Sequence, residues 1–148
     1  MAQAQPETAE HVAIRHMVEE RVNAVRSKNA AALLASYAPD VLTFDLVEPL
    51  ANRGAGALAA RVEQWFGSYE GAIGYDVRDV MLHVAGDVAF GTQFTHVRGK
   101  LAGGPEVDMW FRETVGYRKI EGRWKVVHQH SSVPIDKKDG RARVDLQP

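Results

Sequence analysis

The sequence predicts a single α+β domain, because helical patterns come first along the chain and extended patterns follow. Up to Phe66 the apolar residues recur mainly at helical spacing. From Ile73 onward, four long extended runs are separated by short turn signals. Consecutive strands joined by short turns form an antiparallel meander, and a long twisted sheet of this kind curls. We therefore expect a cone-shaped barrel in which a curved antiparallel sheet packs on three N-terminal helices. The cone is either filled with side chains or open at its mouth as a pocket.

Length and composition are those of one soluble globular domain. The chain has 148 residues, a formal net charge of -1, 45% hydrophobic residues and no cysteine. The balanced charge does not suggest nucleic acid or an anionic membrane as a partner, and no apolar stretch nears membrane-spanning length. The polar N-terminus lacks the features of a signal peptide. We expect a cytoplasmic protein with one domain, 1–148, whose core at about 8–135 lies between a flexible N-terminal arm and a flexible C-terminal tail.

Two helices are predicted before the first strand. Thr8 can cap the first helix. Apolar residues then recur at helical spacing, at Ile14, Met17, Val18, Val22 and Val25. Asn29 can cap a short second helix, AALLASY (31–37), and the Pro-Asp pair at 39–40 ends it.

The rest of the chain is predicted to be one strand, one helix and then the long strands. VLTFDLV (41–47) is expected to form the first strand, and a turn at Asn52-Arg53-Gly54 leads into a third helix, roughly Ala55 to Phe66. The side of this helix expected to be buried carries Leu58, Val62, Trp65 and Phe66. The four long strands are expected within 73–85, 87–101, 107–120 and 122–133.

The last predicted strand contains two histidines one residue apart, in WKVVHQHSSVP (124–134). Side chains alternate along a strand, so one side is expected to carry Trp124, Val126, His128, His130 and Ser132. We expect this row to line the mouth of the cone. The histidines could act as an acid/base pair or bind a ligand carbonyl. They could instead be two ligands of a metal, with Asp45 or Asp108 as a third, or hydrogen-bond within the protein.

Asp45 is the candidate proton carrier, because it lies among Phe44, Leu46 and Val47. Apolar surroundings make a carboxylate a better acid or base near neutral pH. The alternative is an aspartate at a strand end that faces water or pairs with an arginine.

Arg112 and several aromatic residues are candidates for ligand contact. Arg112 lies in phase with Trp110 on the third long strand and could hold a carboxylate or carbonyl oxygen, or else pair with a surface acid. Tyr37, Phe44 and Trp65 lie where helix meets sheet. Such residues are often core, but a buried Tyr37 hydroxyl needs a partner and could face the pocket.

Three motifs carry a resemblance to a known family. They are SYAPDVLTFDLVEPLANRG (36–54), DMWFRET (108–114) and YRKIEGRWKVVHQHSSVP (117–134). From about His11 to Pro134 the chain resembles SnoaL-like proteins related to ketosteroid isomerase, in the nuclear transport factor 2-like superfamily. The resemblance implies a cystatin-like α+β barrel and a homodimer. The H-x-H-x-S-x-P ending is also similar to the association domain of calcium/calmodulin-dependent protein kinase II, which serves oligomerisation.

The first of these motifs can be compared with ketosteroid isomerase residue by residue. It matches that pattern at Tyr37, Asp40, Asp45 and Gly54. The resemblance therefore puts Asp45 where the isomerase has its proton-shuttling base. It departs from the isomerase at Arg21, which stands where the oxyanion-binding tyrosine is expected. It departs again at Phe44 and Leu46, which replace a glutamate and a proline.

These observations favour a small enzyme that needs no cofactor or metal, acting on a compact apolar molecule with a carbonyl or carboxylate. Asp45 would move a proton, while His128, His130 or Arg112 would stabilise the oxygen during isomerisation, cyclisation or dehydration. Further ligand contacts are expected from Tyr37, Phe44, Trp65, Trp110 and Ser132. The chain has no nucleophile elbow, Walker motif or dinucleotide fingerprint. The alternative is a non-catalytic dimer that binds a small acid or only assembles.

Overall fold

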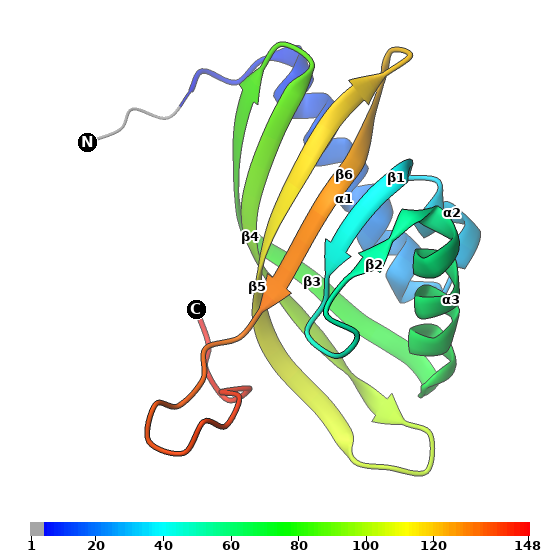
Figure 1. The fold of residues 1–148 in the computed structure, drawn as a ribbon, viewed down its shortest axis with the longest axis vertical. Helices are drawn as coiled ribbons and strands as arrows, with labels where there is room; N and C mark the ends of the chain where they lie inside the picture. The colour runs from blue at the N-terminus through cyan, green and yellow to red at the C-terminus, as the bar shows by residue number, and fades with distance from the viewer. Residues whose placement is uncertain (1–4) are drawn as a thin grey trace.

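The fold is a curved six-stranded sheet with helices on its concave side (Figure 1). The computed structural model describes residues 5–148. The elements are α1 (Ala9–Arg26), α2 (Ala30–Leu34), β1 (Tyr37–Phe44), β2 (Asn52–Arg53), α3 (Gly54–Gly67), β3 (Tyr69–Ala85), β4 (Val88–Leu101), β5 (Glu106–Ile120) and β6 (Arg123–Ser132). The strands lie in the order β2-β1-β6-β5-β4-β3. The predicted α+β class, with helices before the long strands, is confirmed.

The helices form for the reasons that the sequence indicates. Thr8 caps α1, and its side chain accepts a hydrogen bond from the backbone of His11, whose ring nitrogen accepts one in return from the Thr8 backbone. The apolar stripe of α1 packs toward β3, and that of α3 packs toward β1. The buried residues of α3 are Leu58, Val62 and Phe66, whereas the neighbouring Trp65 is only partly buried.

The sheet is mixed rather than wholly antiparallel. The four long strands β3 to β6 form the predicted antiparallel meander. β1, however, lies parallel to β6, which corrects the expectation of an all-antiparallel sheet. The chain enters β1 from the helical layer beside the same end at which β6 begins, so the two strands run in one direction.

The boundary between the second helix and the first strand differs from the prediction. α2 ends at Leu34, and Tyr37 already belongs to β1. The Ser36 carbonyl accepts a hydrogen bond from the Val126 backbone, which draws this segment into the sheet. Pro39 is tolerated because the pairing of β1 with β6 is interrupted between Tyr37 and Leu42.

A one-residue bulge in β6 changes which side chains face the helices. Tyr117 pairs with Val126, but the preceding residue of β5, Gly116, pairs with His128, so Val127 is the extra residue. Trp124 and Val126 are buried before the bulge. After it the inward positions are Gln129 and Ser131, and the histidines are turned to the opposite side.

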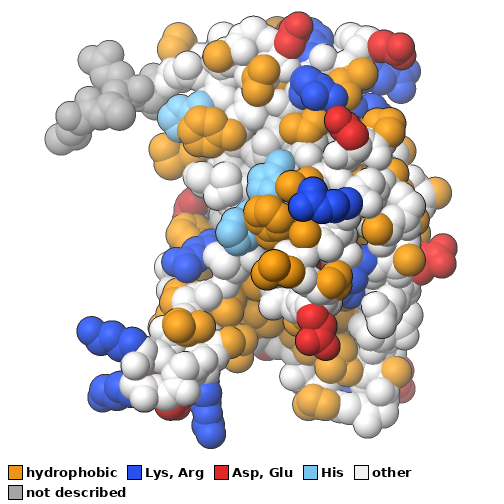
Figure 2. Space-filling model, viewed as in Figure 1, with side chains coloured by type: hydrophobic (Ala, Val, Ile, Leu, Met, Phe, Trp, Pro, Cys, Tyr) orange, Lys and Arg blue, Asp and Glu red, His pale blue; other side chains and the backbone are white. Residues whose placement is uncertain are grey.

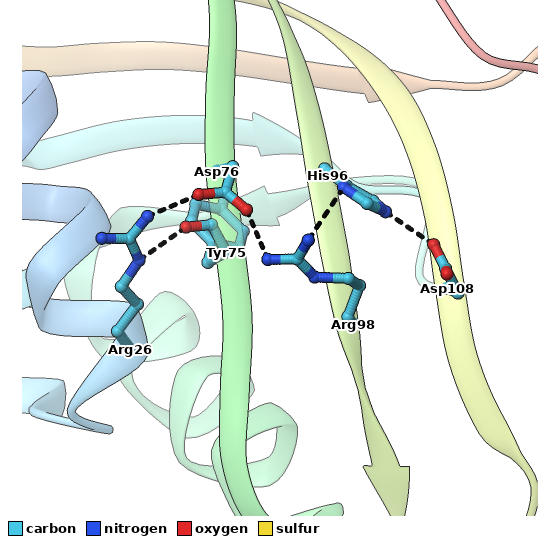
Figure 3. Close-up of polar contacts among 6 residues, drawn as sticks. All are labelled: Arg26, Tyr75, Asp76, His96, Arg98 and Asp108. Atoms are coloured by element: carbon cyan, nitrogen blue, oxygen red, sulfur yellow. Dashed lines mark hydrogen bonds and ion pairs between the residues drawn. The ribbon is translucent and has the colours of Figure 1, made fainter.

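The outer face of the sheet, turned away from the helices, carries a chain of polar contacts (Figure 3). Arg26 of α1 pairs with Asp76 of β3 at 2.5 Å, and Asp76 also pairs with Arg98 of β4. On β4, His96 contacts Asp108 of β5 at 2.6 Å. These pairs tie α1 to the edge strand and link the three strands across the curved end of the sheet.

The two ends of the chain are described to different extents. The predicted N-terminal arm falls partly on residues 1–4, which lie outside the described part. At the other end, Ile135 and Ala142 form an isolated bridge that folds the tail on itself. In residues 5–148 no helix is both long enough and apolar enough to cross a membrane.

Candidate functional site

A cavity of about 260 Å³ lies between the helices and the concave face of the sheet. Its walls are mainly apolar, with valines from α1, α3, β3, β4 and β5. β5 alone contributes six alternate residues, at Val107, Met109, Phe111, Glu113, Val115 and Tyr117. The cone therefore holds a cavity and is not wholly filled with side chains, and the cavity volume is just below the range of about 300 to 1,000 Å³ usual for ligand sites.

The inner end of the cavity is built around Glu113. This carboxylate is only 3% exposed. One oxygen accepts hydrogen bonds from Thr95 and Gln93, at 2.5 and 3.2 Å. The other accepts from Ser131 at 3.0 Å and from the Gln129 amide. With donors on both oxygens, the charge of Glu113 is stabilised by the protein itself.

Arg21 reaches the same network from α1. Its guanidinium donates to Ser36 Oγ at 2.6 Å, and to Tyr37 Oη and Gln129 Oε1 at 3.0 Å each. Tyr37 donates to the same amide oxygen at 2.9 Å, and the guanidinium carbon lies 4.6 Å from the centre of its ring. Gln129 thus connects the positive Arg21 to the negative Glu113 through the two ends of one amide.

Two phenols lie around this charged pair. Burial, followed by the negative charge of Glu113, raises the pKa of Tyr75 well above its usual value. Burial likewise raises the pKa of Tyr117 to about 12. Both side chains therefore remain protonated at neutral pH, so their hydroxyl groups can act as hydrogen-bond donors.

Asp45 lies at the mouth of the cavity, directly after β1. Its carboxylate pairs with Arg61 of α3, with 3.0 Å between Oδ2 and Nε, and its other oxygen accepts from the Leu46 backbone at 2.7 Å. The Asp45 side chain is 29% exposed, far more than Glu113. A carboxylate at an apolar opening, within reach of both solvent and ligand, is suited to carrying a proton between them.

The structure brings together four of the residues that the sequence singles out. The cavity is lined by Tyr37, Phe44, Asp45 and Trp65. Phe44, at the end of β1, also packs edge-on against the rings of His128 and His130, with centroids 4.9 and 5.4 Å away.

The other five lie on the outer face, outside the lining of this cavity. They are Trp110, Arg112, His128, His130 and Ser132. The expectation that the histidine row lines the mouth of the cone is therefore wrong, because the bulge at Val127 reverses the alternation after Val126. Figure 2 shows histidine and hydrophobic side chains together on this outward side of the sheet.

Four of these five side chains have further partners among neighbouring residues. His128 Nδ1 lies 2.8 Å from the Leu42 carbonyl oxygen. Arg112 donates to Ser132 at 2.9 Å. Trp110 stacks on His96, with ring centroids 4.4 Å apart. Within residues 5–148 no three His, Asp or Glu side chains form a group placed to hold a metal ion.

Three polar residues at the inner end, Glu113, Gln129 and Ser131, are absent from the sequence-based candidates. A signal for Glu113 is present on β5, where every second residue from Val107 to Tyr117 is otherwise apolar. An acid in such a row is either exposed by an irregularity or buried with partners. Gln129 and Ser131 give no such signal, because the bulge shifts them out of the alternation that Trp124 and Val126 set.

Chemically, the cavity combines a partly exposed carboxylate, that of Asp45, with hydrogen-bond donors at its inner end. The mainly apolar walls between the two would hold a nonpolar ligand skeleton.

Comparison with known proteins places this chain among small α+β barrels. The model of the SnoaL-like domain matches residues 14–136. An NTF2-like protein of unknown function from Pseudomonas putida KT2440 is 31% identical, with a TM-score of 0.88, over 97% of this chain and 100% of that one. No curated protein matches the chain.

More distant structures share the fold. A ketosteroid isomerase-like protein from Erwinia carotovora atroseptica is 21% identical, with a TM-score of 0.73, over 85% of this chain and 97% of that one. A structure from Xanthomonas campestris, described as a calcium/calmodulin dependent protein kinase II association domain, is 16% identical, with a TM-score of 0.74, over 98% and 95% of the two chains. From the domain match and the Pseudomonas relative, we conclude that the chain belongs to the SnoaL-like family of the NTF2-like superfamily.

Proposed function

We propose that the protein binds a compact apolar molecule bearing a carbonyl or carboxylate in this cavity and acts on it by proton transfer, without a cofactor. The observation that carries the proposal is the open, mainly apolar cavity with Asp45 in its lining. Isomerisation, cyclisation and dehydration of a carbonyl compound all begin by moving a proton next to the carbonyl.

Asp45 is the proposed base. Because the histidines and Arg112 face outward, we propose Arg21 as the cation near the ligand in their place. Proton removal next to a carbonyl puts negative charge on its oxygen. Fixed donors inside a dry cavity stabilise that charge more than they stabilise the starting carbonyl. Tyr37, which bonds to Arg21, and Trp65, which forms part of the wall, would orient the ligand.

Hydrogen exchange of a bound ketone tests this function even when the natural ligand is not known. Methyl β-naphthyl ketone is incubated with the protein in deuterium oxide, and loss of its methyl proton signal is followed by NMR. We expect exchange above the buffer rate, and Asp45→Asn should slow it by about a hundredfold or more. Asp40→Asn is the matched control, since Asp40 is exposed and pairs with Arg118 outside the cavity.

Binding without exchange would favour the alternative of a non-catalytic ligand-binding protein. Exchange that is equally fast with Asp45→Asn would remove Asp45 from the proposed role.

We also propose that the protein is a homodimer that pairs through the outer face. That face carries exposed Phe90 and Phe94 beside the histidine side chains, an apolar area that a second copy would cover. Light scattering should give twice the chain mass of 16.3 kDa. Phe94→Glu should give a monomer, while Val12→Glu, on the exposed side of α1, should not. A monomeric wild type would contradict this pairing.

A further inference from the structure

The charges that line the cavity cancel one another. Four of the lining side chains carry a charge, namely Arg21, Asp45, Arg61 and Glu113. Two are cations and two are anions, so their formal sum is zero. Asp45 pairs with Arg61 at the mouth, and Gln129 links Arg21 to Glu113 at the inner end.

These charges are also engaged by protein groups. Glu113 accepts from four side chains, two on each oxygen. Arg21 donates three hydrogen bonds, to Ser36, Tyr37 and Gln129. At the inner end, the negative charge of Glu113 already compensates the positive charge of Arg21. An anionic ligand would therefore meet no uncompensated cation there.

This balance sets different costs for charged and uncharged ligands. A carboxylate that enters the cavity leaves its water behind and must be compensated by a fixed positive charge. A ketone, ester or amide oxygen needs only a hydrogen-bond donor. The phenols of Tyr75 and Tyr117 are such donors at this end of the cavity, and burial keeps their pKa values high enough for both to stay protonated.

We propose that the ligand of this cavity is an uncharged, oxygen-bearing apolar molecule, and that the Arg21–Gln129–Glu113 chain selects it against carboxylates of the same shape. This inference rests on the proposed function and narrows it, because it removes acids from the ligand class. Glu113 is a specificity-determining residue in this account, since its charge cancels that of Arg21.

A pair of probes of nearly equal shape tests the selection in the wild-type protein. Methyl β-naphthyl ketone and β-naphthoate differ in one methyl group against one charged oxygen, and β-naphthamide is an uncharged control. Calorimetric titration at neutral pH should show that the ketone and the amide bind at least about tenfold more tightly than the carboxylate. Equal or tighter binding of β-naphthoate would overturn the inference while leaving cavity binding intact. Failure of all three probes to bind would overturn it together with the proposed function.

Removing the balancing charge should weaken the preference for the uncharged probe. Glu113→Gln leaves Arg21 uncompensated, so the ratio of ketone to carboxylate affinity should fall by about tenfold or more. Glu63→Gln, the same change on the exposed side of α3, should leave the ratio unchanged. An unchanged ratio in a folded Glu113→Gln variant would show that Arg21 is not the group that Glu113 neutralises. If that variant does not fold, the comparison of the three probes in the wild-type protein still tests the proposed selection against carboxylates.

Discussion

Arg21 and Glu113 hold opposite charges at the inner end of one cavity, and the amide of Gln129 lies between them. Arg21 donates to the amide oxygen at 3.0 Å, and the amide nitrogen donates to Glu113. The two residues stand on α1 and β5, so this contact joins the helical layer to the middle of the sheet. A buried charge without its partner is costly, which makes the pair a test of how the cavity is stabilised.

A double-mutant cycle should detect this coupling. Glu113→Gln and Arg21→Met each leave one buried charge unbalanced, and each should lower the free energy of unfolding by about 3 kcal/mol. The double variant has no unbalanced charge, so its loss should be smaller than the sum by about 1 kcal/mol or more. Urea unfolding of the four proteins measures the cycle. Strict additivity would mean that the two charges do not interact through Gln129.

Tyr117 should make stability fall at alkaline pH. Its pKa is raised to about 12 in the folded protein by burial, against about 10 in an unfolded chain. The contribution of Tyr117 is therefore fully present below about pH 10 and is lost as the pH rises toward about 12. From about pH 9 to about pH 11, the wild type should lose about 1 kcal/mol more than Tyr117→Phe. Urea unfolding at the two pH values measures this difference, and parallel losses would contradict it.

The ion pair at the mouth should matter little for stability. Asp45 and Arg61 are both partly exposed, so water screens their attraction. Asp45→Asn should change the free energy of unfolding by about 1 kcal/mol or less. Thermal unfolding of the purified variant checks this expectation. A much larger loss would mean that slower hydrogen exchange in this variant reflects unfolding and not the missing base.

The bulge at Val127 should be dispensable for the facing of β6. Deleting Val127 removes the one extra residue, so Trp124, Val126, Gln129 and Ser131 would then alternate regularly on the inward side of β6. Because no buried row changes sides, we expect the deletion to lower the free energy of unfolding by no more than about 1 kcal/mol beyond the effect of Val127→Ala. Val127→Ala keeps the bulge and is the matched control. Circular dichroism melting curves compare the two, and a much larger loss of stability in the deletion variant would show that the sheet needs the bulge itself.

Much of the fold was predictable from local patterns. The capping residue Thr8, the apolar stripes of the helices and the turns between the long strands act over a few residues, so the sequence shows them directly. The family resemblance also put Asp45 at the cavity, where it lies. The parallel contact of β1 with β6 was not predictable in this way, because it joins segments about ninety residues apart.

Along the regular strand β5, the sequence by itself determined which residues share a face, and only the tertiary structure decided which face is inside. Trp110 and Arg112 are in phase, as alternation requires, but packing turns them outward and turns Phe111 and Glu113 toward the helices. Alternation along a strand does not say which of its two faces is buried. A polar residue such as Glu113 is expected on the exposed face until its partners from other strands are known. Burial of that carboxylate is stable only because β4 and β6 supply its hydrogen-bond donors, and that assembly exists only in the folded sheet.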